Sequence, residues 1–79
     1  MRARLDPAKV KARRVAMNMT QADLTYRAGI SVGTLSRLEL GLAGSTQILV
    51  ARSIALALGT SVDALSIRRE GDPGDHDTE

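Results

Sequence analysis

The sequence predicts an all-α domain of five helices with no β-strand. Apolar residues recur three or four positions apart, for example at Leu24 and Ala28, and this spacing places side chains on one face of a helix. Thr20 and Ser31, which favour helix N-termini, precede two of these stretches. Gly29 separates the two stretches and can adopt a positive φ angle at little cost.

The first helix is expected over residues 7 to about 17. Asp6 is a strong N-cap, and Pro7 occupies the first helical position, where an amide would have no partner in any case. Asn18 is expected in the left-handed region at the end of this helix. The preceding residues 1–6 are basic and show no periodicity, so they are described as an N-terminal arm.

A tight turn joins the second and third expected helices. The second covers residues 21–28 behind the N-cap Thr20, and the third begins at Ser31 and runs to about residue 40. The turn between them contains Gly29. A helix, a short glycine-containing turn and a second helix make up a helix-turn-helix, whose second helix lies in the major groove of DNA.

A glycine-containing loop over residues 40–45 leads to the fourth expected helix, with Thr46 as its cap and its end at Leu58. A short fifth helix begins at Ser61. We therefore expect one helical domain over residues 7–68. Residues 69–79 are expected to be a disordered acidic tail, because from Glu70 onward no large apolar side chain is present to offset the entropy lost on ordering.

The charge is unevenly distributed. Residues 1–69 hold all 11 Lys and Arg and four acids, which gives 11 − 4 = +7, whereas residues 70–79 hold five acids and no base, which gives −5. A basic body suits a polyanionic partner, because neutralising phosphates releases counterions. A well-solvated surface is the alternative. Arg2 and Arg4 likewise are either an arm that reaches phosphates or the minor groove, or part of a frayed terminus.

Several classes of protein are excluded by composition. There is no cysteine for a disulfide or a thiolate metal site, and the single histidine, His76, lies in the polar tail, so no metal or cofactor is expected. No apolar run approaches ~20 residues, and no signal-peptide pattern is found, so we expect a cytoplasmic protein rather than a membrane protein. Catalysis is not expected, because the acids form no recognisable constellation, and no small-molecule site is evident.

Over about residues 9–67 the sequence resembles the phage repressor and Cro family of helix-turn-helix proteins, also called the Xre family. The residues that carry the resemblance are Arg14, Thr20, Gln21, Gly29, Ser31 and Glu39. The chain departs from the family pattern at Asn18, where Gly is usual, at Thr25, where Ala is usual, and in a longer loop after the third helix. The resemblance implies a lambda-repressor-like five-helix fold that binds double-stranded DNA.

The resemblance also assigns roles to individual residues. It implies that the base contacts come from Val32, Gly33, Thr34 and Arg37. The phosphate contacts would come from Gln21, Ser31 and Ser36. Arg27, Arg13 and Lys9 are further phosphate candidates because of their charge. The alternative for Arg37 is a phosphate contact only, and for Gln21, Arg27, Arg13 and Lys9 it is a solvated surface position. Arg14 and Glu39 would form a structural ion pair between the first and third helices.

The expected function is a transcriptional regulator, most simply a repressor, that binds an inverted-repeat operator as a homodimer. The candidates for the dimer interface are the apolar residues Leu40, Leu42, Leu49, Leu56 and Ile67. The alternative for Leu56 and Ile67 is that they complete the monomer core. The competing function is an antitoxin or another partner-regulated interaction module, with a toxin or an anti-repressor as its protein partner.

Overall fold

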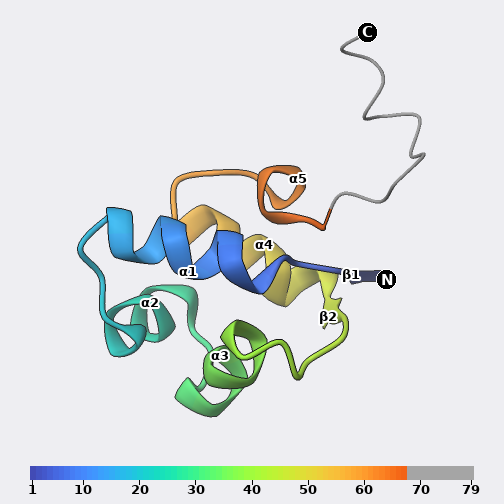
Figure 1. Cartoon of the computed structure of the whole chain (residues 1–79), viewed down its shortest axis with the longest axis horizontal. Coiled ribbons are helices and arrows are strands. Elements are labelled where there is room, and N and C mark those ends of the chain that lie inside the picture. Colours follow the sequence, from blue (N-terminus) through green and yellow to red (C-terminus); the bar gives the residue numbers. More distant parts are fainter. Residues whose placement is uncertain (68–79) are drawn as a thin grey trace, which may run out of the picture.

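The computed structural model describes residues 1–67, so the tail expected over residues 69–79 lies outside the described residues. The predicted five helices are confirmed, and Figure 1 shows their arrangement. They are α1 (Pro7–Ala16), α2 (Gln21–Ala28), α3 (Val32–Glu39), α4 (Ile48–Ala57) and α5 (Val62–Leu65). The expectation that no strand is present is wrong, because β1 (Arg2–Ala3) and β2 (Thr46–Gln47) form a two-stranded sheet.

The first five residues pack against the rest of the domain. β1 pairs antiparallel with β2, with Arg2 opposite Gln47 and Ala3 opposite Thr46. Leu5 belongs to the hydrophobic core and forms an isolated β-bridge with Ser66. The alternative of a frayed terminus is therefore wrong for this segment. A strand of two residues is too short to show the alternating pattern by which strands are predicted.

The predicted caps of the first three helices are confirmed. The Asp6 carboxylate accepts the amide of Ala8 at 2.9 Å, and Asn18 adopts φ 59° after α1. At α2, the hydroxyl of Thr20 accepts the amide of Asp23 at 3.0 Å, and the Asp23 carboxylate accepts the amide of Thr20 at 2.9 Å.

Gly29 and Ser31 make the turn between α2 and α3. Gly29 has φ 72°, in the left-handed region that favours glycine, and its amide donates to the carbonyl of Thr25. The hydroxyl of Ser31 accepts the amide of Thr34 at 3.1 Å and so caps α3. As predicted from the sequence, α2 ends before Gly29 and α3 begins after its N-cap Ser31.

The predicted start of the fourth helix is wrong. Thr46 lies in β2, and Gln47 occupies the N-cap position of α4 without a side-chain hydrogen bond. The first amide of the helix, that of Ile48, instead donates to the backbone carbonyl of Met1 at 3.0 Å. The N-terminal segment therefore supplies a hydrogen-bond acceptor for the first amide of α4, which a side-chain cap would otherwise provide.

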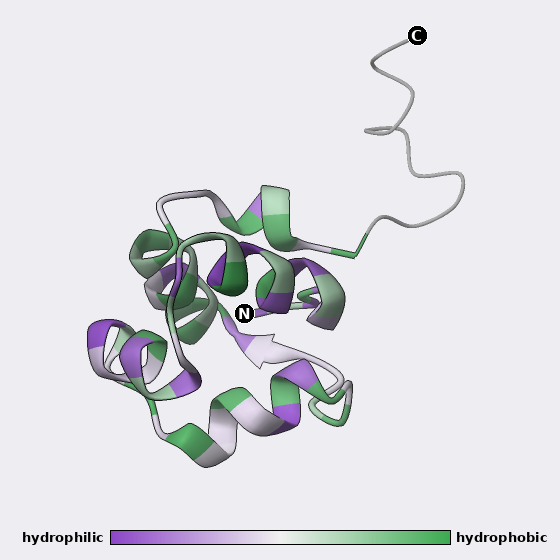
Figure 2. Ribbon diagram, turned by 60° about the vertical axis from the view of Figure 1, so that its left-hand side comes forward, coloured by the Kyte–Doolittle hydropathy of each residue, from purple (hydrophilic) through white to green (hydrophobic). Residues whose placement is uncertain are grey.

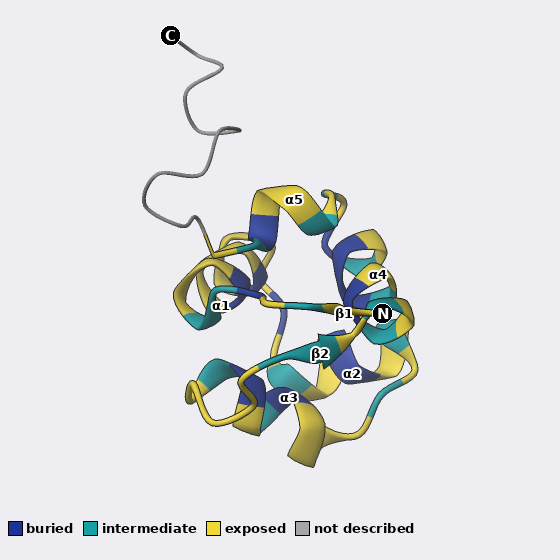
Figure 3. Cartoon of the chain, turned by 90° about the vertical axis from the view of Figure 1, so that its right-hand side faces the viewer, coloured by how far each residue is buried: buried dark blue, intermediate teal, exposed yellow. Residues whose placement is uncertain are grey.

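Figure 2 shows that each helix carries both hydrophobic and hydrophilic residues. The hydrophobic faces meet in one core, in which the largest fully buried side chains are Leu24, Leu35, Ile54, Leu58 and Val10. The extra hydroxyl at Thr25 is accommodated, because it donates to the carbonyl of Ala22 at 2.9 Å. In Figures 1 and 3, α5 lies at one end of the domain and α3 at the other, with α1 between them.

Candidate nucleic-acid interface

Helix α3 is buried on one side and exposed on the other. Leu35 and Leu38 belong to the core, whereas all four residues that were predicted to contact bases are exposed. The N-terminal turn of α3 is thus open to solvent (Figure 3). This turn can enter a DNA groove while the opposite face of the helix stays packed against the domain.

The side chain of Thr34 is held in place by the N-cap of its own helix. Its hydroxyl lies 2.9 Å from that of Ser31, and the Ser31 hydroxyl also accepts the Thr34 amide. One hydroxyl of this pair donates to the other, so their remaining hydrogen-bonding capacity faces solvent. The two residues form one small polar unit at the start of α3.

Gly33 is not required by packing within the domain. A Cβ atom added there would meet only the hydroxyl of Ser31, at 4.0 Å, and Gly33 is not among the glycines with positive φ. Alanine is more favourable than glycine inside a helix by about 1 kcal/mol. Nothing within residues 1–67 therefore requires glycine at this exposed position. Without a side chain, the backbone of Gly33 is open to close contact with a binding partner.

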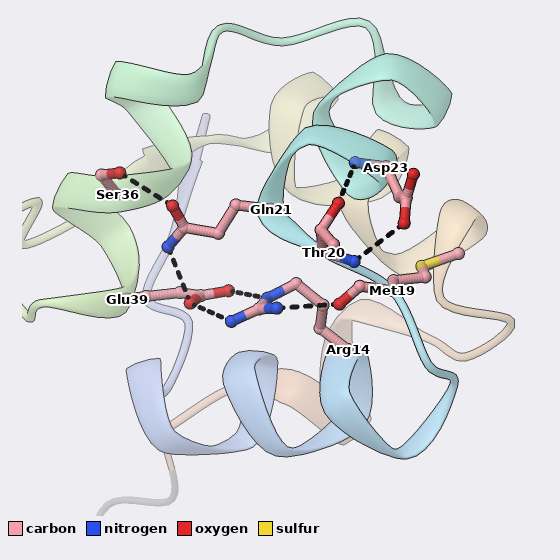
Figure 4. Close-up of polar contacts among 7 residues, drawn as sticks. All are labelled: Arg14, Met19, Thr20, Gln21, Asp23, Ser36 and Glu39. Atoms are coloured by element: carbon pink, nitrogen blue, oxygen red, sulfur yellow. Dashed lines mark hydrogen bonds and ion pairs between the residues drawn. The ribbon is translucent and has the colours of Figure 1, made fainter.

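Arg14 and Glu39 form a forked ion pair between α1 and α3 (Figure 4). Arg14 donates from Nε to Glu39 Oε2 at 2.8 Å and from Nη2 to Oε1 at 3.0 Å. Its third nitrogen, Nη1, donates to the carbonyl of Met19 at 2.8 Å. The side chains are only 11% and 5% exposed, so the pair is largely removed from water.

Gln21 of α2 also joins this network, a contact that was not predicted from the sequence. Its Nε2 donates to Glu39 Oε1 at 3.1 Å, and its Oε1 accepts the hydroxyl of Ser36 at 3.1 Å (Figure 4). The two residues were predicted as separate phosphate contacts, and the structure brings them together across the α2–α3 interface. The amide of Gln21 is thereby fixed at the N-terminal end of α2.

The network also shifts two pKa values. Burial alone would raise the pKa of Glu39, but the hydrogen bonds from Arg14 and Gln21 and the positive charge of Arg14 outweigh burial and lower it. The pKa of Arg14 is raised, chiefly by its hydrogen bonds to Glu39. Both groups are therefore charged at neutral pH.

Lys9 and Arg13, which were predicted as phosphate contacts, make contacts within the domain. Arg13 donates from Nε to the carbonyl of Leu58 at 2.9 Å, and Lys9 donates from Nζ to the carbonyl of Ser66 at 3.1 Å. These carbonyls follow α4 and α5, where cations satisfy free carbonyl groups. Both side chains thus bind carbonyls that follow α5 and α4.

The remaining surface candidates are exposed. Arg27 lies four residues after Asp23 on α2, and its charge helps to lower the pKa of Asp23, although the capping hydrogen bonds from Thr20 have the larger effect. Tyr26, the single aromatic residue, is also exposed and does not cover the core. Both residues are accessible to a partner on the outer face of α2.

All five candidates for the dimer interface are exposed: Leu40, Leu42, Leu49, Leu56 and Ile67. The alternative that Leu56 completes the core is wrong, since this side chain is 82% exposed. Ile67 is not part of the core either. On α4, Leu49 and Leu56 lie seven residues apart and therefore on one face.

Two other kinds of site are absent from residues 1–67. No group of three or more His, Cys, Asp or Glu in this part of the chain is arranged to hold a metal ion. None of the helices described there is long and apolar enough to cross a membrane.

The fold occurs in parts of larger proteins of known structure. A mutant of hydroxyethylphosphonate dioxygenase matches with a TM-score of 0.71 and 25% identity, over 85% of this chain and 14% of that chain. HppE with iron(II) and substrate matches with a TM-score of 0.71 and 30% identity, over 86% of this chain and 40% of that chain. The apo form of HppE gives the same TM-score and identity over 39% of its chain. The chain thus spans less than half of each.

A search of curated proteins gives no match. The model of the helix-turn-helix family, by contrast, matches residues 10–65, which is most of the chain and includes all of α2, α3 and α4. This family is a DNA-binding regulatory one and is not catalytic. The match agrees with the exposed, firmly anchored α3. The chain belongs to the Cro/C1-type helix-turn-helix family of DNA-binding transcriptional regulators.

Proposed function

We propose that the protein is a sequence-specific repressor that binds double-stranded DNA through α3, with α2 and α3 as its helix-turn-helix. The observation that carries this proposal is the division of α3 into two sides. One side is fixed by the core and by the Arg14–Glu39 pair, while the other exposes Val32, Thr34 and Arg37. A helix that is rigidly held and open at its N-terminal turn meets the geometric needs of a recognition helix.

The exposed side chains of α3 suit a few specific base contacts. The methyl groups of Val32 and Thr34 can contact thymine methyls, and Arg37 can donate two hydrogen bonds to guanine. Gly33 has no side chain to contact a base, but it allows the backbone to approach the DNA closely. A good bidentate contact contributes about 1–3 kcal/mol of discrimination between bases. Because the set is small, DNA shape contributes to selectivity as well.

Contacts to the DNA backbone are assigned to the start of α2 and to the polar residues around α3. Gln21 lies at the N-terminus of α2, where backbone amides favour a phosphate, and its partners Glu39 and Ser36 hold its side chain in place. Ser31 and Arg27 complete this set. Lys9 and Arg13 are left out, because they bind the backbone carbonyls that follow α5 and α4.

The proposed active form is a homodimer on an inverted repeat. A single α3 covers only a few base pairs, and two-fold symmetry places two such helices about one DNA turn, ~34 Å, apart. The exposed leucines of α4, Leu49 and Leu56, offer the apolar surface that a two-fold interface needs.

Selection of bound sequences from a random DNA pool tests the function directly. We expect an inverted repeat, with thymine and guanine positions in each half-site that change when Val32 or Arg37 is substituted. Recovery of unrelated sequences, with equal affinity for random DNA, would contradict sequence-specific binding. The spacing between half-sites reports at the same time on the geometry of the dimer.

A protein-interaction module is the second candidate, in the form of an antitoxin or a regulator controlled by a toxin or an anti-repressor. It is favoured by the exposed apolar residues, among them Tyr26 and Leu56, and by the occurrence of this fold as a minor part of two enzymes. A stable stoichiometric complex with a protein from the native host, in the absence of any selected DNA sequence, would favour this function over the first.

A further inference from the structure

An open groove of about 360 Å³ lies between α3, residues 42–47 and α4. Its apolar lining includes Leu38, Val50 and Ile54. Its polar lining includes two arginines from distant parts of the sequence, Arg2 of β1 and Arg37 of α3. The pairing of β1 with β2 brings Arg2 to this position beside the proposed DNA-binding surface (Figure 3).

The guanidinium group of Arg2 is held in a fixed orientation. Its Nε donates to the hydroxyl of Ser45 at 2.6 Å, and its Nη2 donates to the backbone carbonyl of Ser45 at 2.8 Å. Both acceptors are uncharged, so neither neutralises the positive charge. The remaining donors of the group are available to a ligand, and the fixed orientation reduces the entropy lost on binding.

No carboxylate within residues 1–67 compensates the charge of this groove. The acids in this part of the chain are Asp6, Asp23, Glu39 and Asp63, and none of them lines it. Asp6 and Asp23 cap helices, and Glu39 is bound to Arg14. Asp63 lines a separate cleft together with Arg52. Two arginines therefore face a concave surface without a counter-charge from this part of the chain.

We propose that this groove binds a phosphate group, with the guanidinium of Arg2 binding it and the hydroxyl of Thr34 adding a hydrogen bond. The positive charge of Arg37 attracts the phosphate, while its donors remain available to guanine. A guanidinium group matches phosphate oxygens in a fork, which makes arginine well suited to this ligand. The phosphate belongs either to the DNA backbone beside the bases that α3 contacts, or to a phosphorylated small molecule that competes with DNA. Binding of a DNA phosphate rests on the proposed function, whereas binding of a phosphorylated small molecule does not.

Inorganic phosphate tests the site without DNA. We expect that titration into the ¹⁵N-labelled full chain shifts the NMR signals of Arg2 Nε–H and of the Ser45 and Thr46 amides, beyond the effect of chloride at equal ionic strength. Arg2→Gln should abolish these shifts. The matched control is Arg52→Gln, which removes the same charge from the separate cleft, and it should retain them. No groove shifts, or equal shifts in the wild type and Arg2→Gln, would overturn the proposal.

The salt dependence of DNA binding distinguishes the two sources. If the phosphate is that of DNA, Arg2→Gln should reduce the slope of log K against log salt by about 0.9, the value for one lost phosphate contact, and Arg52→Gln should not. If instead the slope is unchanged and a nucleoside monophosphate displaces DNA from the wild type but not from Arg2→Gln, the ligand is a small molecule. If Arg2→Gln leaves the slope unchanged and the nucleoside monophosphate does not displace DNA, the groove binds neither a DNA phosphate nor a competing phosphorylated small molecule, and the proposal is refuted.

The phosphate site can still be tested if the wild type does not bind DNA or if Arg2→Gln does not fold. If the wild type binds no DNA at all, the proposed function fails, and the phosphate titration still decides whether the groove is an anion site. If Arg2→Gln does not fold, as judged by circular dichroism, Arg37→Gln takes its place, because Arg37 is exposed and makes no hydrogen bond to another side chain in residues 1–67. Loss of the phosphate-induced shifts in Arg37→Gln supports the site, and their retention overturns it.

Discussion

Gln21 of α2 donates its side-chain amide to Oε1 of Glu39 at 3.1 Å, the same oxygen that accepts Nη2 of Arg14 at 3.0 Å. One carboxylate of α3 therefore binds side chains from α1 and from α2. The three helices meet at a single buried group on the side of α3 that faces away from solvent. The orientation in which α3 presents its exposed residues consequently depends on this carboxylate.

The first prediction concerns the stability of this connection. Glu39→Ala leaves the guanidinium of Arg14 buried without its counter-charge, and we expect a loss of about 3–5 kcal/mol in the free energy of unfolding. A small domain has a total stability of only about 5–15 kcal/mol, so the variant should lose a large share of its stability. Urea unfolding followed by circular dichroism measures the effect. A free energy within ~0.5 kcal/mol of wild type would show that the pair contributes little.

The second prediction concerns pH. The pKa of Glu39 is lowered in the folded state, so the unfolded state binds more protons as the solution becomes acidic. The resulting stabilisation is complete above the unfolded pKa of about 4.3 and is lost as the pH falls through the lower folded pKa.

Glu39→Gln provides the comparison, because glutamine does not titrate. The stability advantage of the wild type over Glu39→Gln should be constant between about pH 5 and 7 and should shrink below about pH 4. Asp23 also has a lowered pKa, but it is present in both proteins and affects both alike. An advantage that does not change with pH down to about 3 would contradict the assigned direction of the Glu39 shift.

The helices and the α2–α3 turn could be predicted because their signals are local. Thr20, Gly29 and Ser31 each act through hydrogen bonds or φ angles within a few residues of their own position. The start of α4 was mispredicted because its first amide binds the carbonyl of Met1, far away in the sequence. A pattern confined to one segment carries no information about such a partner.

The roles of the cationic residues were predicted less well than the helices. Composition indicates that a surface is basic, but it does not show which cations are engaged by the fold. Lys9 and Arg13 bind carbonyls after α5 and α4, and Arg2 binds Ser45, in each case through contacts between distant segments. No local pattern around Arg13 in the sequence indicates its contact with the carbonyl of Leu58.

The third prediction separates base contacts from phosphate contacts. Arg37→Ala should relax the preference at one or two operator positions, at a cost of about 1–3 kcal/mol against the cognate base. Gln21→Ala should weaken binding equally on all sequences, because its proposed contact is to phosphate. Affinities for a set of single-position operator variants measure both effects. A uniform loss for Arg37→Ala would reassign this residue to the DNA backbone.

Gln21→Ala is also expected to lower the stability of the domain, which has to be separated from its effect on DNA binding. Gln21→Ala also removes hydrogen bonds to Glu39 and Ser36, each of which contributes about 1 kcal/mol to folding. DNA binding by this variant is therefore measured at a temperature at which circular dichroism shows it to be fully folded. Ser36→Ala, which removes only one of these hydrogen bonds, serves as the matched control for the effect on folding.

The fourth prediction uses Gly33, which packing within the domain does not require. Gly33→Ala should raise the free energy of unfolding by up to about 1 kcal/mol, because alanine favours the helix and its Cβ meets only Ser31 Oγ at 4.0 Å. DNA affinity should nevertheless fall, because the added methyl group holds the backbone away from the DNA. A thermal melt and a binding titration on the same preparation measure the two effects. A gain in stability with unchanged affinity would exclude close approach of DNA at this position.

The last prediction concerns the homodimer. Leu49 and Leu56 share one face of α4 and are 69% and 82% exposed, so Leu56→Ser should leave the stability of the monomer almost unchanged. If this face forms the two-fold interface, the same change should weaken assembly of two chains on a palindromic site.

Val15→Ser is the matched control, because Val15 is an exposed apolar residue on α1. Sedimentation with and without the palindromic DNA gives the stoichiometry. A wild-type complex of one chain per site at high protein excess would contradict the dimer, and a dimer insensitive to Leu56→Ser would place the interface on another surface.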